Sequence, residues 1–207
     1  MYSPAKFRVD SVVDNEKLFS LIEQVSFGSL VSMTPSGEID IAYLPFYLDR
    51  AGNRLLGHVA KANPLMNWLE NAAVKVSFVG PNCYVSPSWY EKKDVPTWNY
   101  AVAQLTGEVR LISEPAAAFS VLEKLSDFHE QFLPEPWTMS DLERTRFELL
   151  LKHIQCFEVS IDELNGVFKM SQNRSETDRE NVKTELAGMQ SDAAKGVAAL
   201  MMKDCDD

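Results

Sequence analysis

Residues 28–113 alternate between apolar and polar positions in a way that predicts a run of β-strands. The segments 29–33, 39–48 and 54–60 have strand character, and the polar turns 35–38 and 49–53 separate them. Short polar turns between strands are typical of hairpins. We therefore expect an antiparallel meander in this part of the chain.

The alternation continues beyond residue 70. Residues 74–79 have strand character, and Gly80, Pro81 and Asn82 are expected to turn the chain into a further strand at 83–86. Residues 98–112 are long enough for one extended strand, bent at Gly107. Ordinary strand lengths then predict roughly six strands before residue 113.

Helical spacing precedes and interrupts the strands. Asp14 is a candidate cap, and Leu18, Leu21, Ile22 and Val25 follow it with the three- and four-residue spacing of a short amphipathic helix. A second helical piece is predicted at 63–69, where proline is tolerated in the first turn.

Two helices and a last strand are expected after residue 113. The first helix starts near Ser113, with Val121, Leu122, Leu125 and Phe128 on one face. The second starts at Ser140, whose spacing to Glu143 is that of a capping box. Residues 157–161 alternate again and predict the last strand. The predicted fold class is α+β, mainly β.

The character of the chain changes after Gly166. Residues 171–186 are highly polar, and the remainder is rich in Ala, Met and Asp. Such a segment is expected to form a mobile helix or tail. The predicted organisation is a domain at 1–166 followed by a C-terminal polar helix or tail at 167–207.

The composition fits an ordinary globular domain, with 45% hydrophobic and 24% charged residues. No apolar stretch approaches the roughly 20 residues that span a bilayer, and the first residues lack the order of a signal peptide. We expect a cytoplasmic protein without a membrane segment. Cys83, Cys156 and Cys205 are scattered and show no metal or disulfide spacing, so that we expect free thiols.

The charge balance bears on the partners of the protein. A formal net charge of -10 opposes broad binding to phosphate backbones, because nucleic-acid affinity depends on Lys and Arg. We therefore expect no direct nucleic-acid binding. A small anionic ligand remains compatible with this charge, since a few placed donors hold a phosphate locally.

Residues 57–64 lie where a strand leads into a helical piece. The Lys61 ammonium and the N–H groups of a helix start can converge there on a phosphate, and His58 can add a hydrogen bond. The alternative is that Lys61 is solvated and His58 caps a turn.

Aromatic residues crowd the segments 80–90 and 95–100, which also contain three prolines. Such a stiff region can cover a planar ring, with hydrogen bonds to its polar edge from four side chains: Ser86, Ser88, Thr97 and Asn99. The alternative is that Trp89 and Trp98 fill the end of a barrel.

Residues 169–174 form a third candidate, in which Lys169 and Arg174 reach back over a ligand; the alternative is a solvated terminus. The motifs of serine hydrolases, zinc proteases, phosphate-binding loops and dinucleotide folds are missing. His129 and His153 lack a partner at metal-ligand spacing, and we interpret both as structural or surface residues.

Six ordered motifs resemble the PaiB-like FMN-binding family, whose members are known as negative transcriptional regulators. The similarity extends from residue 1 to about 186 and rests on these segments: MYSPAKF at 1–7, YLPFYLD at 43–49, GHVAKANP at 57–64, GPNCYVSPSWY at 80–90, VPTWNY at 95–100 and KMSQNR at 169–174. The resemblance implies an antiparallel split β-barrel with flanking helices, related to the pyridoxamine 5′-phosphate oxidase type. It also implies a homodimer with an FMN site built from both subunits.

The resemblance assigns cofactor-binding residues to three groups. The flavin phosphate would lie against His58, Lys61 and Ala62. The rest of the cofactor would be surrounded by Ser86, Ser88, Trp89, Trp98 and Asn99. Further contacts would come from Lys169, Gln172 and Arg174.

Two departures from the family pattern affect the expected function. Leu65 and Met66 stand where relatives tend to have Gln and Trp, and Gln104 stands where many have histidine. Gln104 removes an ionisable group, which favours a binding or regulatory role over a defined oxidase. Three hypotheses remain: a flavin-dependent regulator or sensor acting indirectly on transcription, a small flavin reductase or oxidase, and a haem-binding or haem-degrading protein with His58 as axial ligand.

Overall fold

The computed structural model describes residues 8–9 and 12–203, which contain nine strands and five α-helices. The strands are β1 (Arg8–Val9), β2 (Phe27–Met33), β3 (Ile39–Pro45), β4 (Tyr47–Asp49), β5 (Arg54–Ala60), β6 (Ala73–Val85), β7 (Thr97–Ile112), β8 (Ile154–Ser160) and β9 (Glu163–Lys169). The helices are α1 (Val12–Val25), α2 (Pro115–Glu130), α3 (Arg144–Leu150), α4 (Glu176–Gly188) and α5 (Asp192–Lys203), with 3-10 turns η2 (Pro64–Asn67), η3 (Pro87–Trp89) and η4 (Met139–Asp141). The motif at 1–7 and Cys205 lie outside the described residues.

The strands join in the order β3-β2-β6-β7-β8-β5-β4, and β9 pairs with β1 and β7. The strand pairs β1–β9, β2–β3, β2–β6, β4–β5, β5–β8 and β7–β8 are antiparallel, as the sequence predicted. In β7, every second side chain from Asn99 to Val109 is buried, and this pattern explains why sixteen residues stay extended. The predicted antiparallel, mainly β fold is confirmed.

The chain forms two compact units, and β6 and β7 contribute to both. Unit 1 comprises the described parts of 1–21, 79–103 and 165–207, and unit 2 comprises 22–78 and 104–164. The domain boundary predicted after residue 166 falls inside β9.

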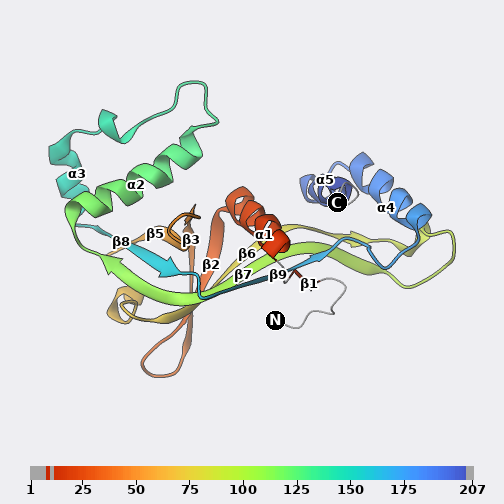
Figure 1. The fold of residues 1–207 in the computed structure, drawn as a ribbon, viewed down its shortest axis with the longest axis horizontal. Coiled ribbons are helices and arrows are strands. Elements are labelled where there is room, and N and C mark those ends of the chain that lie inside the picture. The colour runs from red at the N-terminus through yellow and green to blue at the C-terminus, as the bar shows by residue number, and fades with distance from the viewer. Residues whose placement is uncertain (1–7, 10–11, 204–207) are drawn as a thin grey trace. The chain divides into compact units, whose positions relative to one another are not determined.

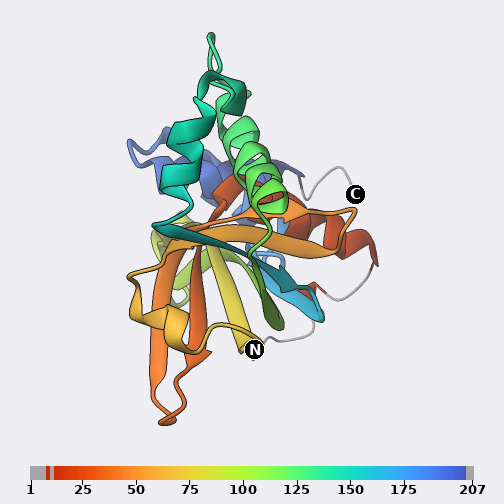
Figure 2. The same ribbon diagram turned by 90° about the vertical axis from the view of Figure 1, so that its left-hand side faces the viewer.

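In unit 2, α2 covers β5 and β8. Ala118, Val121 and Leu125 of this helix are buried in a cluster with Leu56 and Cys156. The spacing of these helical residues is that of one amphipathic face, so that the predicted face of α2 is confirmed. Figures 1 and 2 show α2 next to these strands, with α3 beside it.

In unit 1, α4 and α5 form the segment that was expected to be a polar helix or tail. They bury one side despite their polar sequence, through Val182, Leu186, Ala194, Val197, Ala198 and Met201. Within residues 8–9 and 12–203, no helix is long and apolar enough to cross a membrane.

Several predicted boundaries were wrong. Residues 80–82 do not form a turn, because β6 continues through them to Val85. The glycine there is required by packing instead: a Cβ at Gly80 would lie 2.5 Å from Leu21 Cδ1. The predicted strand 39–48 is two strands, since Phe46 leaves the ladder and donates its N–H to the Ser26 carbonyl at 2.8 Å.

Helix starts also differ from the predictions. Helix α1 begins at Val12, before Asp14. The predicted capping box of Ser140 and Glu143 is wrong, because Asp141 instead accepts a hydrogen bond from the Thr138 N–H at 2.8 Å.

Strand β9 was missed altogether. Asn165 and Gly166 resemble a turn in sequence, but in the structure Gly166 permits close packing within unit 1. A Cβ at Gly166 would lie 2.2 Å from Leu18 Cδ2 and 2.6 Å from the Val102 carbonyl oxygen. The expected last strand at 157–161 is therefore followed by another.

Candidate functional site

His58 lies on β5, opposite Cys156 of β8. Its side chain is half-buried, and the buried Nδ1 atom has no hydrogen-bond partner in the part of the chain that the structure describes. Burial lowers the pKa of His58, so that the neutral imidazole dominates at pH 7. A ligand atom next to Nδ1 would relieve the cost of this unpaired polar atom.

Lys61 directly follows β5, and its backbone is hydrogen-bonded to the residue before β8. Its N–H donates to the His153 carbonyl at 2.8 Å, and its Nζ donates to the Leu151 carbonyl at 2.7 Å. The side chain is exposed, as is Ala62. The structure therefore gives Lys61 a defined anchor and a solvent-accessible charge.

The predicted helix start at 63–64 is only the 3-10 turn η2, four residues long. Asn63 caps it, because its side-chain oxygen accepts the Leu65 N–H at 3.0 Å. The helix-start contribution to anion binding that we expected from the sequence is thus small, and Lys61 with His58 would supply the contacts in this group.

Ser86 and Ser88 form a tight turn in unit 1, where β6 leads into η3. The Ser86 Oγ accepts the Ser88 N–H at 3.2 Å, and the two hydroxyls lie 2.7 Å apart. Ser88 is exposed and Ser86 is half-exposed. Both hydroxyls can still accept or donate one further hydrogen bond to a ligand.

Helix α4 holds the loop that follows η3. Asn181 donates to the Trp89 carbonyl at 3.1 Å, and Asp178 accepts the Glu91 N–H at 2.8 Å. Arg174 is paired with Asp94, and its guanidinium lies 4.2 Å from the ring centre of Tyr90. Arg174 therefore stabilises the loop that contains Tyr90 and Asp94, a role that the sequence did not indicate.

Trp98 is the most accessible of the predicted aromatic residues, with 49% of its side chain exposed. Tyr84 meets it edge to face at 6.3 Å between ring centres, and the indole N–H donates to the Asn82 side chain at 3.3 Å. These contacts orient an aromatic surface at which a planar ring can stack.

Asn99 is fully buried on β7 and ties two distant segments of unit 1 together. Its Nδ2 donates to the Ser171 Oγ at 2.9 Å and lies 3.8 Å from the Met201 sulfur. The Ser171 hydroxyl in turn lies 3.3 Å from Asn99 Oδ1. Most of the hydrogen-bonding capacity of Asn99 is therefore used inside the protein.

Lys169 and Gln172 also make internal contacts. Lys169 donates to the Thr97 hydroxyl. The side chain of Gln172 accepts the Met170 N–H and donates to the Phe168 carbonyl. Gln104, in unit 2, donates to the Ser77 hydroxyl at 3.4 Å.

The predicted residues thus fall into two groups, which we describe separately. His58, Lys61 and Ala62 belong to unit 2, and the remaining eight belong to unit 1. FMN needs a cation and hydrogen bonds for its phosphate, and an aromatic surface for its ring. The charge of Lys61 and the unpaired Nδ1 of His58 suit the former, and Trp98 with Tyr84 suits the latter.

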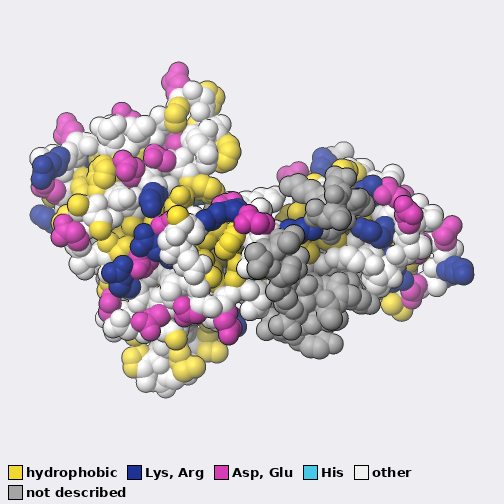
Figure 3. Space-filling view, viewed as in Figure 1, with side chains coloured by type: hydrophobic (Ala, Val, Ile, Leu, Met, Phe, Trp, Pro, Cys, Tyr) yellow, Lys and Arg dark blue, Asp and Glu magenta, His cyan; other side chains and the backbone are white. Residues whose placement is uncertain are grey.

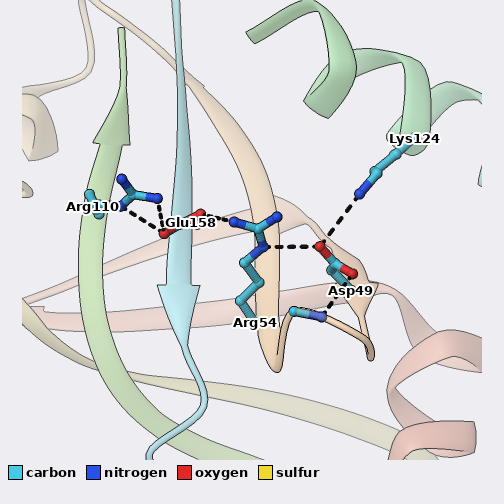
Figure 4. Close-up of polar contacts among 6 residues, drawn as sticks. Asp49, Arg54, Arg110, Lys124 and Glu158 are labelled. Carbon is cyan, nitrogen blue, oxygen red and sulfur yellow. Dashed lines mark hydrogen bonds and ion pairs between the residues drawn. The ribbon is translucent and has the colours of Figure 1, made fainter. Parts of the chain in front are cut away.

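Sequence reasoning missed the charged side chains of unit 2 that meet between β5, β7 and β8. Glu158 contacts both Arg54 and Arg110, and Asp49 and Lys124 extend the cluster (Figure 4). Alternation placed Glu158 on a polar face, but its partners depend on the strand pairing, which the sequence does not contain.

Comparisons with known proteins bear on these groups. The sequence model of a family described as "Putative FMN-binding domain" matches residues 1–163. The Bacillus subtilis protein named "Protease synthase and sporulation protein PAI 2" is 31% identical over 204 residues, which are 97% of this chain and 96% of that protein.

Solved structures show the same fold. The FAD and heme binding protein from Mycobacterium smegmatis has a TM-score of 0.61 at 18% identity, over 83% of this chain and 78% of that one. The flavocytochrome Anf3 from Azotobacter vinelandii has a TM-score of 0.57 at 17% identity, over 87% and 78% of the two chains. At these identities the likeness concerns the fold alone, which agrees with the predicted split barrel.

Proposed function

Because the chain belongs to the FMN-binding family whose sequence model matches residues 1–163, we propose that it is a flavin-dependent regulator or sensor. Membership confirms the family and the cofactor, FMN, that the sequence predicted. The observation that carries the regulatory role is the relation over 97% of the chain to the B. subtilis protein, whose name refers to protease synthesis and sporulation. When bound, FMN supplies one- or two-electron transfer.

The action on transcription is proposed to be indirect. The net charge of -10 disfavours contact with DNA phosphates, because each such contact needs a cation on the protein. A gel shift at nanomolar protein on a defined promoter, stable at about 150 mM salt, would contradict this part of the proposal.

Lys61 and His58 are proposed to hold the flavin phosphate. Lys61 would add a charge-assisted hydrogen bond, and His58 Nδ1 would gain the partner that it lacks among the described residues. The eight predicted residues of unit 1 are proposed to contact the ring and the ribityl chain, with Trp98 and Ser88 as the accessible ones.

The test is an FMN titration that follows the quenching of flavin fluorescence. Lys61→Ala should weaken FMN binding about tenfold or more, since a charge-assisted contact contributes roughly 1.5–3 kcal/mol. Lys152→Ala is the matched control, because Lys152 is an exposed lysine of the same unit and should leave affinity unchanged. Equal affinity of Lys61→Ala and the unmodified protein would refute the phosphate assignment.

A homodimer is proposed because unit 2 exposes an apolar sheet face at β3, the first strand in the sheet order. Ile39, Ile41 and Tyr43 point to one side of β3 and are 72%, 48% and 64% exposed. Met33 pairs with Ile39 and adds to this face. Continuous apolar patches of this kind are typical of interaction surfaces. Sedimentation should therefore give a dimer, and Ile41→Glu should give a monomer.

Haem is the second candidate ligand, since the mycobacterial protein of the same fold is described as binding FAD and heme. The half-buried His58 is the residue that would ligate the iron. Separate titrations with FMN and hemin discriminate the two. A Soret band together with weak FMN binding would contradict the flavin proposal.

A further inference from the structure

Unit 2 contains a pocket of about 430 Å³ between α2 and the strands β5, β7 and β8. This volume lies in the range of small-molecule sites. Charged and aliphatic side chains line it, among them Arg54, Arg110, Lys124, Leu56, Ile112 and Val121. The pocket is separate from the residues discussed for FMN, because His58, Lys61 and Ala62 do not line it.

The polar side of the pocket is built around Glu158, whose side chain is only 14% exposed. One carboxylate oxygen lies 2.5 Å from Arg54 Nη1, and the other lies 2.6 Å from Arg110 Nη2. The register explains this arrangement, because Arg110 and Glu158 are direct neighbours across β7 and β8 (Figure 4).

Asp49 belongs to the same cluster and forms ion pairs with two of its cations. It lies 3.0 Å from Arg54 Nε and 3.4 Å from Lys124 Nζ, but it does not line the pocket. Figure 3 shows Lys and Arg side chains gathered beside acidic ones on this face, near α2 and the strands below it.

The cations retain donors for a ligand. The hydrogen bonds and ion pairs with Asp49 and Glu158 involve Nε and Nη1 of Arg54 and Nε and Nη2 of Arg110, so that the other terminal nitrogen of each guanidinium can donate to a ligand. Arg110 is 67% exposed, so that its remaining edge is accessible. Three cations and the two carboxylates Glu114 and Glu158 line the pocket, and Asp49 pairs with two of the cations from outside the lining.

The pocket also has apolar lining residues, and one of them, Leu56, lies directly across from Glu158 in the strand pairing. Leu56, Ile112 and Val121 line the pocket together with Ala117, which lies on the same face of α2 as Lys124. A pocket lined by both cationic donors and aliphatic side chains suits a ligand that carries an anionic group and an apolar body.

We infer that this pocket binds a small organic anion, with its oxyanion head group on Arg54, Arg110 and Lys124 and its apolar body against Leu56, Ile112 and Val121. The site is independent of the proposed FMN site. A carboxylate and a phosphate monoester share the oxyanion chemistry that this pocket recognises, and the experiment distinguishes them.

Isothermal titration calorimetry of the full chain with benzoate, phenyl phosphate and benzyl alcohol tests the inference. One anion or both should bind with one-to-one stoichiometry, and the neutral alcohol should bind much more weakly. Arg110→Gln should weaken anion binding about tenfold or more, because it removes a charge-assisted donor. Arg146→Gln, at an exposed arginine of α3 in the same unit, should leave the affinity unchanged.

Ala117→Phe gives an independent test, because it fills the pocket from an exposed helix position and removes no charge. It should abolish anion binding while circular dichroism and FMN affinity stay as in the unmodified protein. The inference is overturned if neither anion binds at millimolar concentration, if benzyl alcohol binds equally well, or if Ala117→Phe retains the full affinity. Loss of FMN binding alone would refute only the proposed function.

Discussion

Gly107 lies where β7 passes the end of β8, both within unit 2, and a single methyl group there should be costly. A Cβ built at this position would lie 1.7 Å from the Ser160 carbonyl oxygen, whereas ordinary contact begins at 3.4 Å. Because the clashing atom belongs to the backbone of Ser160, no change of side-chain rotamer can relieve the clash. Gly107→Ala therefore forces the two strands apart by more than about 1 Å.

The expected loss follows from the contacts beside Gly107. The Glu108 N–H donates to the Ser160 hydroxyl at 2.9 Å, and the Asp162 N–H donates to the Thr106 carbonyl at 3.0 Å. Each hydrogen bond contributes about 0.5–1.5 kcal/mol, and separation of the strands breaks both. With the added disturbance of packing, Gly107→Ala should lower the free energy of unfolding by about 2–4 kcal/mol.

Urea unfolding followed by circular dichroism measures this loss as a lower midpoint. Gly188→Ala is the control, since a Cβ there would meet no atom within 4 Å. Gly188 ends α4, so alanine should change stability by no more than about 0.5 kcal/mol. If Gly107→Ala and the unmodified protein unfold at the same urea concentration, the contact argument is wrong.

Three further substitutions test other parts of the structure. Burial lowers the pKa of His58 below its ordinary 6.5; the unfolded chain therefore binds the proton more readily, and stability is lost as the pH falls below about 6.5. Thermal melts between about pH 5 and 7 should be flatter for His58→Gln, and equal slopes would contradict this sign. Asn99→Ala leaves the buried Ser171 hydroxyl without its partner and should cost about 1–3 kcal/mol in chemical unfolding, whereas Ser88→Ala at the surface should cost almost nothing. Glu158→Gln removes the ion pair of Arg110 and leaves Arg54 paired with Asp49 alone, and it should cost about 1–2 kcal/mol, an effect that should shrink in about 1 M NaCl through screening; a salt-independent loss would point to packing instead.

Periodicity along the chain was a sound guide to the elements in which burial alternates. Strands β2 and β7 and the apolar face of α2 follow directly from the spacing of their apolar residues. The family and its cofactor were also accessible, because long motifs such as the one at 57–64 survive in the sequence. The residues assigned to FMN remain predictions.

Glycines misled the sequence reading where packing, not turn geometry, required them. Gly80 was interpreted as part of a turn and Gly166 as the end of the domain, yet both lie inside strands, next to Leu21 and Leu18 of α1. A glycine in the sequence is compatible with either a turn or a close packing contact. Only the neighbouring helix reveals which of the two applies.

The sequence by itself therefore determined the antiparallel, mainly β fold, most of its elements and the FMN-binding family, because these depend on local spacing and on long motifs. The tertiary structure alone decided which side chains meet. Asn99 and Ser171 are 72 residues apart in sequence, and Arg110 and Glu158 are 48 apart, yet each pair is in contact. Such pairs follow from strand register and helix docking, which many residues set together, and for that reason no local pattern predicts the pocket beside Arg110 and Glu158.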